Sequence, residues 1–194
     1  MLSMDGGWMG DNVPAVDLGT DRSAKSVAVG GYHSCAVLDN GSVKCWGSYY
    51  SGKLGIRGWE NIGDDSGEMG DSLPAVDLGT GRSALSVAAE DSSTCALLDN
   101  GSVKCWGFNR SGQLGLGDTS DRGAGEGQMG DSLPAVDLGT GRWAKFIVMG
   151  CAILDDNSLK CWGLNTFGEL GLGDTNSRGD QGGEMGDSLP AVDL

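Results

Sequence analysis

The residues of this chain best suited to chemistry are six cysteines, which occur as three pairs with one spacing. The pairs lie in the segments CAVLDNGSVKC, CALLDNGSVKC and CAILDDNSLKC. Two thiols at such a spacing could bind a metal, exchange electrons or form a disulfide. The chain has one histidine and no C-x-x-C pair, which disfavours both a zinc centre and a redox-active dithiol. Disulfides are therefore expected, with buried free thiols as the alternative.

The register of a hairpin favours a disulfide within each pair. If the loop of the second pair is Asp99-Asn100-Gly101 with its glycine left-handed, Cys95 faces Cys105 at a non-hydrogen-bonded site. Paired α-carbons at such a site lie about 4.5 Å apart, within disulfide range. In the third unit Asn157 takes the place of the glycine. We predict the bridges Cys35–Cys45, Cys95–Cys105 and Cys151–Cys161, and hence an oxidising compartment.

The other candidates for chemistry are a histidine and loop carboxylates. His33 is the only candidate general base, and no Ser-His-Asp order or phosphate loop accompanies it. We therefore predict that the protein is not an enzyme and uses no cofactor. Flexible acidic loops can hold Ca²⁺, although the EF-hand pattern is absent and a plain solvated loop is the alternative. The calcium candidates are Asp64, Asp65, Glu68 and Asp71.

Charge and hydropathy narrow the class of partner. The formal net charge is −14, with 13 basic and 27 acidic residues, and the estimated isoelectric point is 4.2. Binding to a nucleic-acid backbone needs clustered Lys and Arg, so no nucleic-acid partner is predicted. An acidic surface suits solubility, cations or a basic protein. No run of about 18 apolar residues occurs, so no membrane span is predicted.

Internal repeats set the architecture. MGDNVPAVDLGTDR at 9–22 returns as MGDSLPAVDLGTGR at 69–82 and at 129–142, and the chain stops inside another copy. Twelve residues separate Arg82 from Cys95, but only eight separate Arg142 from Cys151, so the third unit has lost a short turn. A single repeat domain (1–194) is predicted, made of repeat 1 (about 9–68), repeat 2 (about 69–128), repeat 3 (about 129–184) and a partial repeat (185–194).

Within each unit the local signals predict strands. In unit two these are SALSVAA, TCALLD and SVKCWGF. The LPAVDLG segment has a proline as its second residue, which the start or the edge of a strand tolerates. Four short antiparallel strands in a unit of about 60 residues are typical of a β-propeller blade. We predict an all-β fold of such blades, with three complete repeats and a partial fourth, as a fragment of a larger propeller.

The order of motifs resembles a known family. VAVGGYHSCAVLDNGSVKCWGSYYSGKLG at 27–55 resembles the regulator of chromosome condensation repeat through Gly30, His33, Trp46-Gly47 and GKLG. GQLG at 112–115 and GELG at 168–171 repeat the last motif. The resemblance implies a seven-bladed propeller in which the histidine packs structurally. The cysteine-bearing version looks like the secreted branch of that family.

Departures from the family pattern concern the second and third units. Glu90 and Ser93 stand where unit two should have the glycine and the histidine, and unit three lacks the segment. Each unit carries a WG tryptophan that is expected in the blade core, namely Trp46, Trp106 and Trp162. Three further tryptophans have no counterpart in the other units and are candidates for a contact surface, namely Trp8, Trp59 and Trp143.

Three functions are compatible with this sequence. The favoured one is a non-catalytic propeller module that binds a protein through its variable acidic, Gly-rich loops, in an extracellular or cell-surface location. The second is a guanine-nucleotide exchange factor-like regulator of a small GTPase, in the cytoplasm or nucleus, which the resemblance alone suggests. The third is a secreted enzyme inhibitor or polysaccharide-binding propeller. Three blades cannot close a seven-bladed ring, so self-association through open blade edges is also predicted.

Overall fold

The computed structural model describes residues 13–193, and these form three separate antiparallel sheets of three strands each. The first sheet contains β1 (Ala24–Val29), β2 (His33–Leu38) and β3 (Val43–Gly47). The second contains β4 (Ala84–Glu90), β5 (Ser93–Leu98) and β6 (Val103–Gly107), and the third contains β7 (Ala144–Val148), β8 (Cys151–Leu154) and β9 (Leu159–Cys161). Four short 3₁₀ helices lie in the connections, namely η2 (Tyr50–Gly52), η3 (Gly70–Ser72), η4 (Gly130–Ser132) and η5 (Gly186–Ser188).

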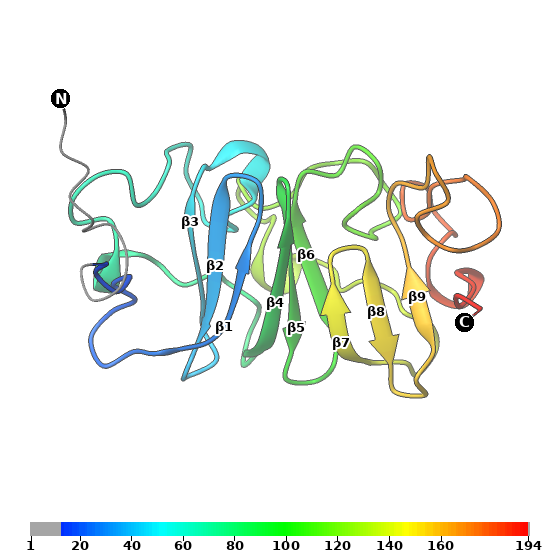
Figure 1. The fold of residues 1–194 in the computed structure, drawn as a ribbon, viewed down its shortest axis with the longest axis horizontal. Helices are drawn as coiled ribbons and strands as arrows, with labels where there is room; N and C mark the ends of the chain where they lie inside the picture. Colours follow the sequence, from blue (N-terminus) through cyan, green and yellow to red (C-terminus); the bar gives the residue numbers. More distant parts are fainter. Residues whose placement is uncertain (1–12, 194) are drawn as a thin grey trace, which may run out of the picture.

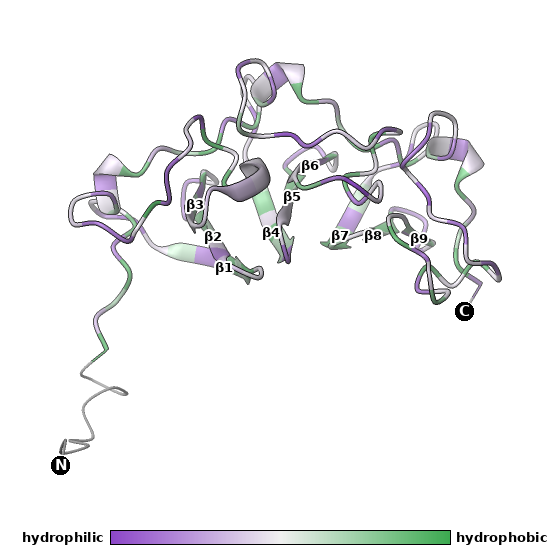
Figure 2. Ribbon diagram, turned by 90° about the horizontal axis from the view of Figure 1, so that it is seen from above, coloured by the Kyte–Doolittle hydropathy of each residue, from purple (hydrophilic) through white to green (hydrophobic). Residues whose placement is uncertain are grey.

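The sheets stand side by side along an arc, as successive blades of a propeller do (Figures 1 and 2). In Figure 2 the first strand of each sheet lies on the concave side and the long connections lie on the convex side. The predicted all-β, blade-like architecture is confirmed. In the part of the chain that the structure describes, no helix has the length and apolar character to cross a membrane.

Each sheet has one strand fewer than the sequence predicts. The proline-led segments were expected to form a fourth strand, but each makes a single backbone hydrogen bond to its neighbour. Val76 N donates to Val43 O, Val136 N to Val103 O, and Val192 N to Leu159 O, each at 2.8 Å. Proline has no N–H to donate, and the following Asp and Gly turn the chain away, so no ladder forms.

The central hairpin of each sheet has the expected register. Cys35 pairs with Cys45, Cys95 with Cys105, and Cys151 with Cys161, each pair with α-carbons 4.1 Å apart and a disulfide between the sulfurs. The turn residue is left-handed in every case, with φ of 80° at Gly41, 79° at Gly101 and 70° at Asn157. The predicted bridges are confirmed, and no cysteine is free.

The hydrophobic core lies between sheets as well as within them. One cluster joins Val37 and Leu54 of the first unit to Leu98 and Trp106 of the second. A second cluster joins Leu97 and Leu114 of the second unit to Ile147 and Trp162 of the third, all among side chains at most a few per cent exposed. Because each sheet completes its core on its neighbour, the chain is stabilised by nearest-neighbour interfaces, as in repeat proteins generally.

The third unit carries the predicted deletion at its first hairpin. Strand β4 has seven residues and β5 six, whereas β7 has five and β8 four. Val148 pairs with Cys151 as Ala88 pairs with Cys95, so Met149 and Gly150 replace a longer turn. Figure 1 shows that the β7–β8 hairpin stops short of the other two.

Candidate interaction face

The first and second sheets meet at a seam that is closed by side-chain hydrogen bonds. The carbonyl oxygen of Lys53, in the GKLG segment, accepts from Thr94 Oγ1 at 2.9 Å and from Trp106 Nε1 at 3.0 Å. His33 Nε2 lies 2.8 Å from Thr94 Oγ1. Since the threonine donates its only hydroxyl proton to Lys53, the histidine must donate to the threonine. A four-residue chain of hydrogen bonds therefore joins the first blade to the second.

His33 is a structural residue of this seam. Its side chain is 3% exposed, and Nδ1 has no hydrogen-bond partner. Burial, with a smaller contribution from the positive charge of Lys53, lowers the pKa of His33 from its ordinary 6.5 to about 4. The histidine is therefore neutral at pH 7. Its bond reaches into the next blade, which the sequence alone does not indicate.

Lys53 places a buried ammonium group at the same seam. The residue is 1% exposed, and Nζ lies 5.6 Å from the ring centre of Tyr32 and 6.0 Å from that of Tyr50. Its other polar contact is Ser92 Oγ at 3.4 Å. Burial lowers the pKa of Lys53, while the negative charge of Asp91 acts in the opposite direction. Aromatic faces thus replace part of the water that this cation would otherwise bind.

The second and third sheets meet at a more open seam. Trp162 Nε1 donates to Gln113 O at 3.2 Å, which matches the contact of the WG tryptophan in the first seam. The deleted turn has removed the threonine equivalent, and Gly150 stands at its place next to Cys151. A cavity of about 780 Å³ lies here, lined by residues of all three units.

The loops that follow β6 and β9 are closed by a buried asparagine. Asn109 is fully buried, donates from Nδ2 to Asp118 O at 2.8 Å, and accepts from Leu114 N at 3.0 Å. Arg122 Nη2 pairs with Asp118 at 2.6 Å and completes the loop. The third unit repeats this arrangement with Asn165, Leu170, Asp174 and Arg178.

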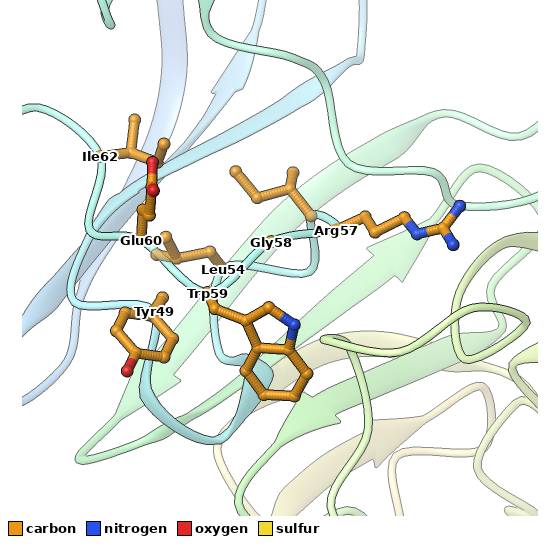
Figure 3. Close-up of a pocket in the computed structure, with 8 residues that line it drawn as sticks. Tyr49, Leu54, Arg57, Gly58, Trp59, Glu60 and Ile62 are labelled. Atoms are coloured by element: carbon orange, nitrogen blue, oxygen red, sulfur yellow. The ribbon is translucent and has the colours of Figure 1, made fainter.

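The loop after β3 lacks all of these closing groups. Tyr49 stands at the position of the asparagine, and the residues at the Asp and Arg positions are Gly58 and Ile62. A pocket of about 310 Å³ opens in their place, and Figure 3 shows Tyr49 and Trp59 on one side of it. The two rings meet edge to face, with centroids 6.5 Å apart and planes at 84°. The Trp59 side chain remains 72% exposed.

The calcium candidates of this loop have separate hydrogen-bond roles. Glu68 Oε2 accepts from Gly63 N at 2.7 Å and from Asp65 N at 3.1 Å, and the amide of Gln128 caps the equivalent turn of unit two. Asp71 accepts from the backbone and hydroxyl of Thr20, and these bonds lower the pKa of the carboxyl group. Among residues 13–193 no group of three or more His, Cys, Asp or Glu side chains could hold a metal ion. Calcium binding through Asp64, Asp65, Glu68 and Asp71 stays a prediction.

A set of structural lysines is absent from the sequence-based predictions. Lys44 Nζ donates to Leu18 O at 3.0 Å and to Gly70 O at 2.7 Å, which ties the segment before the sheet to helix η3. Lys104 and Lys160 repeat both bonds in the later units. The sequence signal that could have identified these lysines is their recurrence directly before the second cysteine of every unit.

The tryptophans fall into two groups. Trp106 is fully buried and Trp162 is 2% exposed, which confirms their core role, whereas Trp46 of the first unit is half-buried. Trp143 is 47% exposed and lies against the turn glycine Gly101. Trp8 lies outside the described residues.

Comparison with known proteins agrees with this geometry. The model of the regulator of chromosome condensation (RCC1) repeat matches residues 24–52 and 85–113. The chain is 32% identical to the ultraviolet-B receptor UVR8 of Arabidopsis thaliana over 158 residues, which cover 79% of this chain and 32% of that protein. It is 35% identical over 103 residues to the probable E3 ubiquitin-protein ligase HERC4 of Rattus norvegicus, covering 53% of this chain and 9% of that one. The protein therefore contains repeats of the RCC1 family, at residues 24–52 and 85–113.

Solved structures show the same fold. Prp20p of Saccharomyces cerevisiae superimposes with a TM-score of 0.57 at 22% identity, covering 89% of this chain and 37% of that one. Human WBSCR16 gives a TM-score of 0.59 at 20% identity, covering 82% and 40%. The chain thus spans well under half the length of the relatives and structures that it matches.

Proposed function

We propose that this protein is a non-catalytic propeller module that binds a protein partner through the loops after the third strand of each sheet. The observation that carries the proposal is the loop after β3. The equivalent loops after β6 and β9 are each closed by a buried asparagine and an Asp–Arg pair. The loop after β3 instead presents Trp59 beside an open pocket. Exposed tryptophan next to a pocket is typical of the residues that dominate protein interfaces.

The loops lie on a support that holds them in place. All three are closed at their base by the same pair of backbone bonds, as between Gly47 and Ile62 at 2.7 and 3.0 Å. Binding residues are commonly carried by loops on such scaffolds. Arg57 of the open loop also pairs with Glu126 of the next loop at 3.1 Å, although both side chains are largely exposed. Neighbouring loops therefore form one continuous face.

We also propose an extracellular or cell-surface location, supported by the three disulfides. The competing hypotheses are nucleotide exchange on a small GTPase, which would go with reduced thiols in the cytoplasm or nucleus, and polysaccharide binding. The acidic composition supports a basic partner in preference to an acidic one.

The test is retention of partner proteins by the immobilised, disulfide-intact chain. Trp59→Ala should reduce retention of a specific partner about tenfold or more, the loss expected at an interface hot spot. Phe146→Ala is the matched control, because Phe146 is 55% exposed on strand β7, outside the loops that follow the third strands. Retention that the two variants lower equally, or that Trp59→Ala leaves unchanged, would contradict the proposal.

A further inference from the structure

The cavity at the second seam is a direct consequence of the deletion in unit three. Its volume of about 780 Å³ falls in the range of pockets that enclose small ligands or whole side chains. Trp162 and Phe108 line it from two different blades, and Tyr32 reaches it from the first. The cavity therefore offers aromatic faces from three units around one space.

The polar lining of this cavity is negative. Glu90 and Asp91 come from the β4–β5 turn, and Glu169 comes from the GELG segment of the third unit. Of the described residues that line the cavity, none is Lys or Arg. Glu169 accepts a hydrogen bond from Phe167 N at 2.7 Å, while Glu90 and Asp91 have no side-chain hydrogen bond or ion pair among residues 13–193. Carboxylates beside low-dielectric aromatic walls attract a cation more strongly than carboxylates in open water.

One wall of the cavity already contacts a cation of this chain. The ammonium of Lys53 lies over the rings of Tyr32 and Tyr50 and contacts Ser92, and these three residues also line the cavity. This ammonium offsets part of the negative charge of Asp91, so Glu90 and Glu169 supply the uncompensated negative charge of the cavity.

We propose that this cavity receives an arginine side chain of the protein partner, an inference that rests on the proposed function. A guanidinium group is planar and stacks on exposed aromatic faces such as that of Tyr32, and its donor edges match a carboxylate. The net charge of −14 favours the approach of a basic segment. Against a second copy of this chain, the same charge is repulsive.

The probe is the peptide acetyl-Gly-Arg-Gly-amide, with the neutral citrulline peptide as its matched control. Binding is followed by NMR at the indole N–H of Trp162, which lines the cavity, and at that of Trp106, which is sealed in the first seam. We expect a saturable shift at Trp162 with the arginine peptide only, and none at Trp106. Absence of a shift, or an equal shift with citrulline, would overturn the inference.

Charge variants test whether the carboxylates act locally. Glu169→Gln should weaken the affinity for the arginine peptide about fivefold, because one nearby charge is lost. Asp21→Asn makes the same change in net charge ahead of strand β1, outside the cavity and the proposed binding loops, and it should change the affinity less than about twofold. Equal effects would mean that only the overall charge matters, and would also overturn the inference.

A variant that fills the cavity distinguishes binding inside it from attraction by the negative charge around it. Replacing Met149-Gly150 by the longer turn of residues 89–94 should fill the cavity and abolish binding, although it adds two acidic residues. Unchanged binding would exclude the cavity as the site. If the partner is lost with Trp59→Ala but kept with both cavity variants, the proposed function holds and the arginine inference fails.

Discussion

The two seams of this protein use the same tryptophan contact and differ in almost everything around it. In the first, Trp106 and Thr94 share one carbonyl oxygen of Lys53, and His33 extends the chain of bonds. In the second, Trp162 makes its bond to Gln113 beside an open cavity. The tryptophan therefore sets how neighbouring blades stack, and the turn next to it decides whether the seam is sealed.

This difference has a simple physical origin. The deleted residues belonged to a turn, and its loss leaves the strands paired. Strand β7 still pairs with β8 from Phe146 to Val148, which lies opposite Cys151, and the bulge after Ala144 is also present in the other two sheets. In stacked repeats each interface contributes separately to stability. One seam can consequently become open while the other remains closed.

The largest expected effect distinguishes the two tryptophans. Trp106→Ala should lower the free energy of unfolding by about 4 kcal/mol, because it leaves a void in a fully buried site and an unpaired Lys53 carbonyl. Trp162→Ala should cost about 1 kcal/mol less, since Trp162 borders the cavity and water can enter the space that its removal leaves. Urea denaturation of both variants checks this, and equal losses would show that the seams are energetically alike.

Between pH 6.5 and about 5, above the range in which the carboxyl groups titrate, the pH dependence of stability should come from the first seam. The pKa of His33 is about 4 in the folded chain and near its ordinary 6.5 in the unfolded chain. Above pH 6.5 both states are neutral and His33 contributes no slope. As the pH falls from 6.5 to 4, only the unfolded state takes up the proton of His33, so this residue alone should lower stability by about 3 kcal/mol.

His33→Gln is the control for this slope, because glutamine can donate to Thr94 without titrating. Denaturation at several pH values should show the slope in the parent chain and a nearly flat profile between pH 6.5 and about 5 in the variant, above the range in which the carboxyl groups titrate. A slope that persists in the variant would assign it to other groups.

The disulfides should differ in their accessibility to reductant. Cys35, Cys45, Cys95 and Cys105 are fully buried, whereas Cys151 is half-buried and lines the cavity of the second seam. Thiol attack needs access to a sulfur atom, so Cys151–Cys161 should be reduced about tenfold faster than the others. Timed reduction followed by alkylation and peptide mapping measures the order. Simultaneous reduction of all three would indicate global unfolding.

The smallest effect concerns the hairpin turns. Asn157→Gly should change stability by less than about 0.5 kcal/mol, because the left-handed turn already accommodates asparagine. Gly101→Asn should cost about 1 kcal/mol or more, since a Cβ there would lie 2.8 Å from Cβ of Trp143. Thermal melts of the two variants compare them, and equal shifts would show that the Trp143 contact is unimportant.

The local features of this protein follow from its sequence. The repeat spacing defines the units, and the Asp-Asn-Gly turn defines the register that brings Cys95 opposite Cys105, because hairpin geometry depends only on neighbouring residues. The shorter interval before Cys151 also predicted the loss of a turn in unit three. The fourth strand was predicted wrongly, since a proline-led segment resembles an edge strand whose neighbour can be identified only in space.

The contacts between units were decided by the tertiary structure. The packing of one sheet on the next decides three features of the structure. It decides which carbonyl accepts from Trp106, where the ammonium of Lys53 is buried, and whether a missing turn leaves a cavity. Residues such as Tyr49 and Asn109 stand at equivalent positions in the sequence, but only the packed loop shows that the asparagine closes it and the tyrosine leaves it open. Sequence thus determines what local hydrogen bonding can specify, and long-range packing determines where the binding surfaces lie.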